Sequence, residues 1–216
     1  NVPREIINFK GNNVIAVRVF DSQLAGGIVS GDIGIYVNQS SFDVEYVLAG
    51  IWDFKIGDNP DWSRKDLNTE DWIKTMVPGF WRYIGYGEYD GFAWYRKKFY
   101  FNMDENQHYV LVLGKIDDLD EVYINGKLVG STGDINSKFI EGSEYNKFRV
   151  YYLVDYVLKE NENNVIAVRV YDGRQDGGIY EGPIGIMKKS TFQKFSERKD
   201  IENRRKNKSI WELIFN

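Results

Sequence analysis

Residues 121–130 decide the fold and read Glu-Val-Tyr-Ile-Asn-Gly-Lys-Leu-Val-Gly. The pair Asn125-Gly126 lies between two runs of strand-forming residues, and both of its members tolerate the positive φ angles that a two-residue hairpin turn requires. We therefore expect a β-hairpin here, in which Asn125 and Gly126 have a structural role.

Strand-length segments continue on both sides of this hairpin. Residues 94–101 alternate with a period of two, and residues 109–113 read Tyr-Val-Leu-Val-Leu, an unbroken apolar run that is typical of a strand covered on both faces. Further strands are expected at 46–54, 148–153 and 165–171. Because no helical pattern alternates with these segments, the sequence predicts an all-β sandwich or barrel.

The composition excludes several kinds of function. The chain has 216 residues, which leaves no room for a large catalytic barrel. It contains no cysteine, which excludes thiol nucleophiles, disulfides and thiolate metal sites, and its single histidine, His108, excludes a histidine metal cluster. We expect His108 to be a surface residue at a strand end. The net charge of -4 argues against nucleic-acid binding, and no apolar run is long enough for a membrane span.

An internal repeat divides the chain. Residues 12–35 align without gaps on residues 163–186, and 16 of the 24 aligned positions are identical. The second copy closes a segment of domain length, so we interpret residues 1–37 as the closing strands of a preceding, similar domain and residues 38–187 as the main domain. Because a strand such as 14–20 needs a sheet, we expect residues 1–37 to dock on the main domain or to form a homodimer with another chain.

The last part of the sequence, residues 188–216, differs from the rest. It carries a clear excess of lysine and arginine over acidic residues and has few helix breakers. Its final residues are again apolar, with Trp211, Leu213, Ile214 and Phe215. We expect a basic helical tail whose apolar end packs on the sandwich, in preference to a juxtamembrane segment.

Three segments resemble the galactose-binding-like jelly roll of glycoside hydrolase family 2, the sugar-binding domain of β-galactosidases and β-glucuronidases. These segments are 91–99, 113–126 and 164–172. The resemblance implies a jelly-roll β-sandwich and, by the habit of that family, a location outside the cytoplasm. In that family the catalytic carboxylates lie on a later barrel domain, so the resemblance implies a non-catalytic chain whose parent protein is a candidate glycoside hydrolase.

One strand carries a charged residue that needs a partner. Arg96 lies in the same predicted strand as Trp94, and both are expected to be structural. A half-buried guanidinium requires a carboxylate, and we expect that carboxylate to come from the acid-rich turn 117–121. The alternative for this turn is a calcium site, with ligand candidates Asp117, Asp118 and Asp120, although the spacing lacks the glycine of an EF-hand loop. No other cofactor is expected.

Two glycine-rich segments have the composition of a sugar-binding site. Aromatic faces stack on sugar C–H groups while charged and amide groups bind hydroxyls, and loops at the ends of a sandwich are where such sites occur. The alternative is that the aromatic residues pack over the open end of the sandwich. The candidate ligands lie in segments 78–91 and 172–181 and are Trp81, Tyr83, Tyr86, Tyr89, Asp90, Arg174, Asp176 and Tyr180.

Three functional hypotheses therefore remain open. The first is a non-catalytic carbohydrate-binding module that belongs to a larger multidomain bacterial protein. The second is a structural or signalling jelly roll that mediates contacts between domains or subunits and binds no sugar. The third is an accessory domain of a β-galactosidase-like hydrolase of family 2. Expected partners are carbohydrate, other domains of the same protein and a second copy of residues 1–37.

Overall fold

The chain divides into two compact units, Asn1–Ser41 and Phe42–Asn216. All of the assigned strands lie in the second unit. The computed structural model describes residues 6, 8, 11–20, 27–28, 44–102, 107–154 and 156–197.

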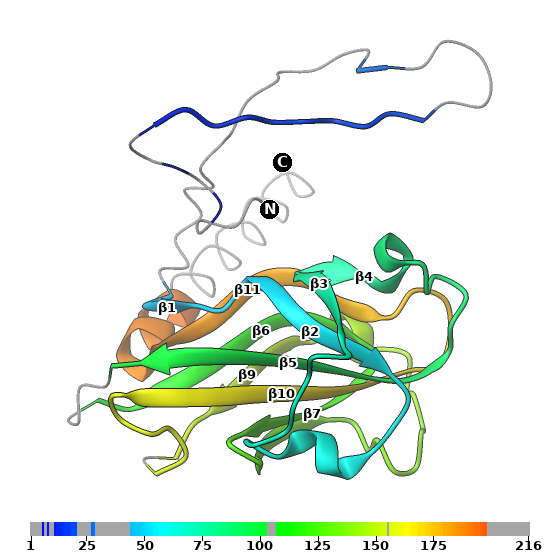
Figure 1. The fold of residues 1–216 in the computed structure, drawn as a ribbon. Coiled ribbons are helices and arrows are strands. Elements are labelled where there is room, and N and C mark those ends of the chain that lie inside the picture. The colour runs from blue at the N-terminus through cyan, green and yellow to red at the C-terminus, as the bar shows by residue number, and fades with distance from the viewer. Residues whose placement is uncertain are drawn as a thin grey trace, which may run out of the picture. The chain divides into compact units, whose positions relative to one another are not determined.

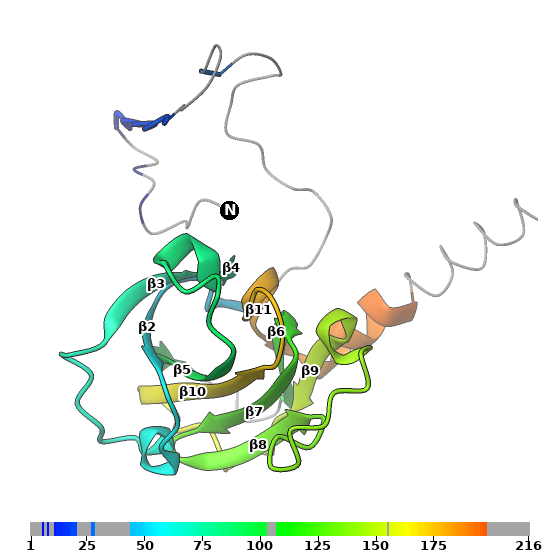
Figure 2. The same cartoon turned by 90° about the vertical axis from the view of Figure 1, so that its right-hand side faces the viewer.

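The second unit is a sandwich of two antiparallel sheets, which are seen from two directions in Figures 1 and 2. The five-stranded sheet has the order β1-β11-β6-β9, and β4 also pairs with β11. Its members are β1 (Tyr46–Val47), β4 (Gly79–Phe80), β6 (Tyr109–Asp117), β9 (Phe148–Tyr152) and β11 (Gly178–Lys188).

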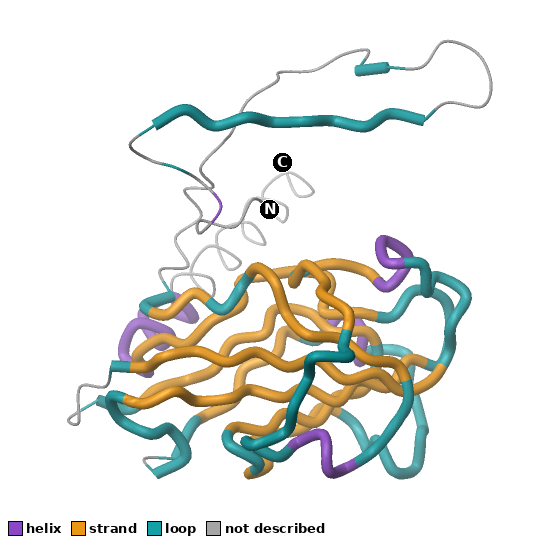
Figure 3. Tube along the Cα trace, in the orientation of Figure 1, coloured by secondary structure: helices purple, strands orange, loops and turns teal. Residues whose placement is uncertain are grey.

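The six-stranded sheet has the order β3-β2-β5-β10-β7-β8. Its members are β2 (Gly50–Ile56), β3 (Ile73–Val77), β5 (Gly91–Phe101), β7 (Leu119–Ile124), β8 (Lys127–Thr132) and β10 (Glu162–Asp172). All strand pairs within the described ranges are antiparallel, and Figure 3 shows that strands dominate the main unit. The expected all-β sandwich is confirmed.

Strand β10 holds the centre of the six-stranded sheet, because it pairs with β5 on one side and with β7 on the other. Its period-2 pattern places Ile166, Val168 and Val170 in the core between the sheets, where all three are buried. Ala167 faces the opposite side. Both faces of this strand are therefore covered.

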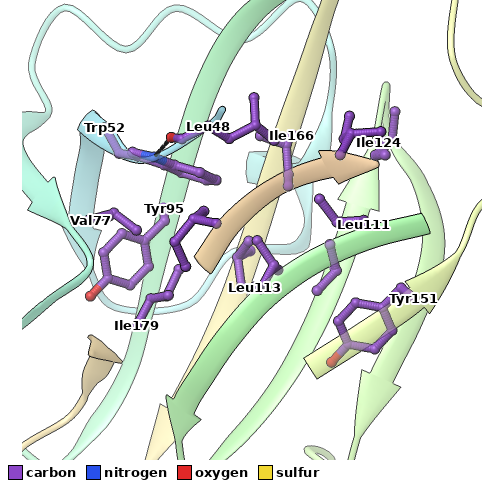
Figure 4. Packing of buried hydrophobic residues seen from close by; sticks show 14 of the residues in the cluster. Leu48, Trp52, Val77, Tyr95, Leu111, Leu113, Ile124, Tyr151, Ile166 and Ile179 are labelled. Atoms are coloured by element: carbon purple, nitrogen blue, oxygen red, sulfur yellow. Dashed lines mark hydrogen bonds between the residues drawn. The ribbon is translucent and has the colours of Figure 1, made fainter. Parts of the chain in front are cut away.

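The core between the sheets is filled by large apolar side chains from both layers. Figure 4 shows Trp52 and Tyr95 of one sheet facing Leu111 and Leu113 of the other. A buried indole N–H needs a hydrogen-bond acceptor, and that of Trp52 donates to the Leu48 carbonyl oxygen at 2.8 Å. Burial of each such side chain contributes about 1.5–3 kcal/mol to folding.

The predicted hairpin is confirmed as β7–β8, with φ angles of 52° at Asn125 and 81° at Gly126. The Asn125 side chain also ties this turn to the start of β10. Its Nδ2 donates to Asn164 Oδ1 at 2.7 Å and to the Val157 carbonyl oxygen at 3.0 Å, and its Oδ1 accepts from the Val165 N–H at 3.0 Å. The turn is thereby fixed to a strand that lies far along the chain.

The predicted partner of Arg96 was wrong. Arg96 is buried, but its guanidinium donates to the backbone carbonyl oxygens of Trp62 and Arg64, and its neighbour across the sheet is Asp53 of β2. The acid-rich turn lies beyond β10, where Arg169 of β10 instead pairs with Glu121 at 3.0 Å. The order of the strands, rather than charge alone, selects the partner.

Trp94 has the structural role that was expected of it, on the outer face of the six-stranded sheet. It is buried there beneath Trp62 and Trp72 and beside Tyr123. The Trp94 indole N–H donates to Asp58 Oδ1 at 3.1 Å. The segment before β3 thus closes this face as a second, smaller core.

Residues 189–197 form the first part of the predicted tail helix. Phe192 packs on the outer face of the five-stranded sheet against Val110, Val112 and Met187. The expected docking of the last apolar residues concerns positions beyond 197, which lie outside the described residues. No helix within the described part of the chain is long and apolar enough to cross a membrane. His108 is exposed directly before β6, as predicted.

The described part of the first unit includes residues 11–20, the copy of the β10 sequence. No β-ladder is assigned to these residues, and Val14, Val17 and Phe20 have exposed side chains. A strand forms part of a sheet only when a neighbouring strand pairs with its backbone N–H and C=O groups, so a strand-forming sequence alone does not make a sheet. The division at residue 37 and the docking of residues 1–37 stay predictions.

Candidate functional site

Two of the predicted loops meet at one end of the sandwich. The 3-10 turn η3 (Trp81–Ile84) follows β4, and the segment 173–177 leads into β11 (Figure 1). Gly178 pairs with Phe80 at the start of β11, and the Trp81 N–H donates to the Gly177 carbonyl oxygen at 2.9 Å. Residues that are distant in sequence therefore contribute to one surface.

An ion pair joins the two loops. The Arg82 guanidinium contacts the Asp176 carboxylate, which is mostly covered. Arg82 also lies over the Phe80 ring, at 4.9 Å from its centroid, and Phe80 stacks on Tyr180 at 4.9 Å with an interplanar angle of 10°. Arg82 and Phe80 were absent from the predicted ligand set, although Arg82 lies within the predicted loop.

The prediction of Trp81 as a sugar ligand was wrong. Trp81 is fully buried, and its indole N–H donates to Tyr95 Oη at 2.7 Å in the core. A β-carbon at Gly177 would come within 2.3 Å of the Trp81 ring, so the loop is packed closely on this side chain. The packing alternative holds for Trp81, because a buried indole has no face left for a ligand.

The other predicted aromatic residues differ in exposure. Tyr86 and Tyr89 are half-buried against the core, and the Tyr89 hydroxyl donates to the Phe92 carbonyl oxygen at 2.9 Å. Tyr180 is also half-buried, and its hydroxyl donates to the Tyr145 carbonyl oxygen at 2.7 Å. Tyr83 is 73% exposed. Of this group, Tyr83 offers the most ring surface to a ligand.

The predicted polar ligands lie at the same end. Asp90 and Arg174 are exposed, and the Arg174 backbone N–H donates to Asp172 Oδ1 at 3.3 Å. Together with Arg82 and Asp176 they supply donors and acceptors of both charges in the two loops. Such a mixture can bind sugar hydroxyls while the ring packs on C–H groups.

A group of three carboxylates lies at the start of the loop 173–177. Asp117, Asp118 and Asp172 each place a carboxylate oxygen within 4.8 Å of the others. Burial, followed by the adjoining Asp118 carboxylate, raises the pKa of Asp117 to about 7. Burial is also the largest cause that raises the pKa of Asp172 to about 7, with Asp118 and Asp90 adding repulsion. Sequence reasoning missed Asp172, which follows a strand that is distant along the chain.

Asp120 does not belong to this group, so its prediction as a calcium ligand was wrong. It is fully buried, accepts from Arg149 Nε at 2.7 Å and also accepts from the Tyr151 hydroxyl. The remaining Arg149 donors bind backbone carbonyl oxygens, including that of Asp118 at 2.6 Å. Alternation along β7 turns Asp120 inward, so it forms a structural ion pair.

A separate groove of about 800 Å³ crosses the outer face of the six-stranded sheet. Charged side chains of both signs line it, among them Asp53, Lys65, Arg96 and Glu162. None of the residues that were predicted as sugar ligands lines this groove.

No family model matches the sequence. A curated protein of Formosa agariphila named "Putative beta-glucuronidase" is 27% identical over 147 residues, which is 62% of this chain and 13% of that protein. The chain therefore spans about an eighth of the curated relative that it matches.

Solved structures of family 2 glycoside hydrolases also resemble this chain over part of their length. A calcium-binding mutant of Bacteroides uniformis β-glucuronidase 2 has a TM-score of 0.52 at 22% identity, over 62% of this chain and 17% of that one. A family 2 glycosyl hydrolase from Bacteroides cellulosilyticus has a TM-score of 0.51 at 19% identity, over 62% of this chain and 19% of that one. The expected resemblance is confirmed: the chain has the β-sandwich fold of one part of family 2 glycoside hydrolases.

Proposed function

We propose that this chain is a non-catalytic carbohydrate-binding module of a larger multidomain protein, located outside the cytoplasm. The observation that carries the proposal is the meeting of segments 78–91 and 172–181 at one end of the sandwich. These segments carry the exposed Tyr83 ring and the exposed side chains of Arg82, Asp90 and Arg174, which are the kinds of group that a shallow sugar site requires.

A non-catalytic role is supported by the carboxylates of this end. Glycoside hydrolysis uses two carboxyl groups about 5–9.5 Å apart, on either side of the scissile bond. The oxygens of Asp117, Asp118 and Asp172 lie within 4.8 Å of one another, and Asp172 is fully buried. The buried Asp172 carboxylate therefore has no open face for a glycosidic bond.

A structural module that binds no sugar is the second candidate, and the repeated segment favours it. Residues 12–35 copy the β10–β11 sequence, and Val14 and Phe20 of the copy expose their side chains. Exposed apolar segments with a strand pattern can mediate contacts between domains or subunits. The accessory-domain hypothesis agrees with either role, since the relatives of this chain are hydrolases of much greater length.

The test is binding of the full chain to a glycan panel that includes galactosides and glucuronides. We expect binding that falls about tenfold or more in Tyr83→Ala and Arg174→Ala, since each removes a contact from a small site. Tyr156→Ala, which removes an exposed aromatic from another loop, is the matched control and should bind like the wild type. Absence of binding, together with a dimer that is lost when residues 1–37 are removed, would favour the structural module.

The outer groove is tested in the same assay. Tyr100 lines this groove and is exposed. If Tyr100→Ala abolishes glycan binding while Tyr83→Ala retains it, the sugar site lies on the sheet face and the proposed loop site is wrong.

A further inference from the structure

The carboxylates of the partly buried Asp117 and of the buried Asp118 and Asp172 come together at the points where strands end and begin. Asp117 closes β6 opposite Gly178 of β11, and Asp118 directly precedes β7. Asp172 closes β10, and the Asp118 N–H donates to the Tyr171 carbonyl oxygen at 3.3 Å. Both sheets therefore contribute to this cluster, and its position is fixed by their ladders.

One carboxylate oxygen of the cluster has no hydrogen-bond partner. Asp118 Oδ2 accepts from the Gly173 N–H at 3.3 Å, and Asp172 Oδ1 accepts from the Arg174 N–H at 3.3 Å. Asp172 is fully buried, yet its Oδ2 has no hydrogen-bond partner. Buried polar atoms in native proteins are nearly always paired, so a buried carboxylate oxygen without a donor indicates a partner of another kind.

Positive side chains do not supply that partner. Among residues 44–102, 107–154 and 156–197, no lysine or arginine forms an ion pair with Asp117, Asp118 or Asp172. Arg149 acts on Asp117 only through its charge, because its hydrogen bonds go to Asp120 and to backbone carbonyl oxygens. Within these ranges the three carboxylates thus have no direct ion pair, and burial of like charges without one is costly.

We propose that Asp117, Asp118 and Asp172 bind one divalent cation of the oxygen-preferring class, with Ca²⁺ as the ion of choice. Oxygens that share one Ca²⁺ lie about 2.3–2.6 Å from the ion, so their mutual distances do not exceed about 5 Å. One oxygen from each of the three carboxylates lies within 4.8 Å of the other two. The set contains carboxylates alone, which suits a hard cation and disfavours Zn²⁺.

Such an ion would fix the loops above it. Asp118 and Asp172 already hold the backbone of Gly173 and Arg174, which begin the loop that leads to Asp176. A cation that binds the folded protein stabilises it in proportion to the logarithm of its concentration above the dissociation constant. This inference does not depend on carbohydrate binding, because none of the three cation ligands is a proposed sugar ligand.

The experiment measures cation binding by the full chain without any glycan. The chain is treated with chelator and titrated with CaCl₂ by calorimetry, and its melting temperature is recorded with and without millimolar CaCl₂. We expect binding of one Ca²⁺ per chain and a higher melting temperature in its presence. In Asp172→Asn and Asp118→Asn the affinity should fall about tenfold or more, because Ca²⁺ sites are tuned by the number of charged ligands.

A matched control separates this site from general charge effects. Asp66→Asn removes an exposed carboxylate that pairs with Arg64, and it should bind Ca²⁺ like the wild type. Without calcium, Asp172→Asn should melt no lower than the wild type, because it removes repulsion, and this shows that the variant folds. No calcium binding by the wild type, or an unchanged affinity in both cluster variants, would overturn the proposal and leave shared protons as the partner of Asp172.

Discussion

The two copies of the repeat contrast the same sequence in two surroundings. Residues 163–186 and 12–35 are identical at 16 of 24 positions. Val168 is fully buried in β10, whereas its counterpart Val17 is 63% exposed. The strand pattern is present in both copies, but only β10 has β5 and β7 beside it within the described residues. The burial of these valines therefore depends on the neighbouring strands, and the sequence of the segment only makes it able to pair with them.

The largest effect is expected at a matched pair of isoleucines. Ile166→Ala leaves a cavity in the core and should lower the free energy of unfolding by about 3 kcal/mol. Ile15→Ala, at the same position of the copy, should change it by less than about 0.5 kcal/mol, because the Ile15 side chain is 70% exposed. Urea denaturation of both variants measures the difference. Equal losses would mean that residues 12–20 are packed in a sheet of their own.

A matched pair of glycines should give the next largest difference. Gly178 and Gly27 both have positive φ angles, so alanine is strained at either position. A β-carbon at Gly178 would also lie 2.6 Å from the Gly79 carbonyl oxygen, whereas one at Gly27 meets nothing within 4 Å. Gly178→Ala should therefore cost about 2–3 kcal/mol, through strain and overpacking combined. Gly27→Ala should lower the melting temperature much less, and the reverse order would contradict this account.

A smaller difference is expected at the two arginines of the repeat. Arg169 is mostly covered and pairs with Asp58 at 2.5 Å and with Glu121 at 3.0 Å. Arg169→Ala should lower the free energy of unfolding by about 1–2 kcal/mol, because two carboxylates lose their partner. Arg18→Ala, at an exposed position, should have little effect on chemical denaturation. A double variant that includes Glu121→Gln would show whether the loss at Arg169 is electrostatic.

The smallest effect concerns the tail helix, which the repeat does not contain. Phe192→Ala should lower the free energy of unfolding by about 1 kcal/mol, since Phe192 is only partly buried over Val110 and Met187. Thermal melts of this variant and of Lys194→Ala, a solvent-facing control in the same helix, test it. An equal change in the two variants would mean that the helix does not cover this face.

Local signals predicted the fold well, and tertiary arrangement limited the prediction of the site. The Asn125-Gly126 turn is specified by two adjacent residues, and it formed as expected. The partner of Arg96 depended on β10 lying between β5 and β7, which no local pattern encodes. Trp81 looked like a surface aromatic because it lies in a glycine-rich loop, yet it packs into the core.

The membership of the acidic cluster was predicted only in part, also because it depends on the tertiary arrangement of the strands. Asp117, Asp118 and Asp120 are neighbours in sequence, but strand alternation turns Asp120 towards Arg149. Asp172 replaces it from a distant strand end. The sequence contains one indication of Asp172: an aspartate follows the repeated strand segment in both copies, as Asp21 and Asp172.

The repeat also bears on how the chain folds. The position between β5 and β7 accepts one strand, and the sequence contains two segments that match it, 13–19 and 164–170. The earlier segment leaves the ribosome before β5 and β7 exist, whereas β10 follows both of them. The first copy is therefore present as a competitor while the sheet assembles, and refolding must discriminate between two nearly equal partners. Contacts outside the matched segment, such as the hydrogen bond from Asn125 to the Val157 carbonyl oxygen, distinguish the later strand from the first copy.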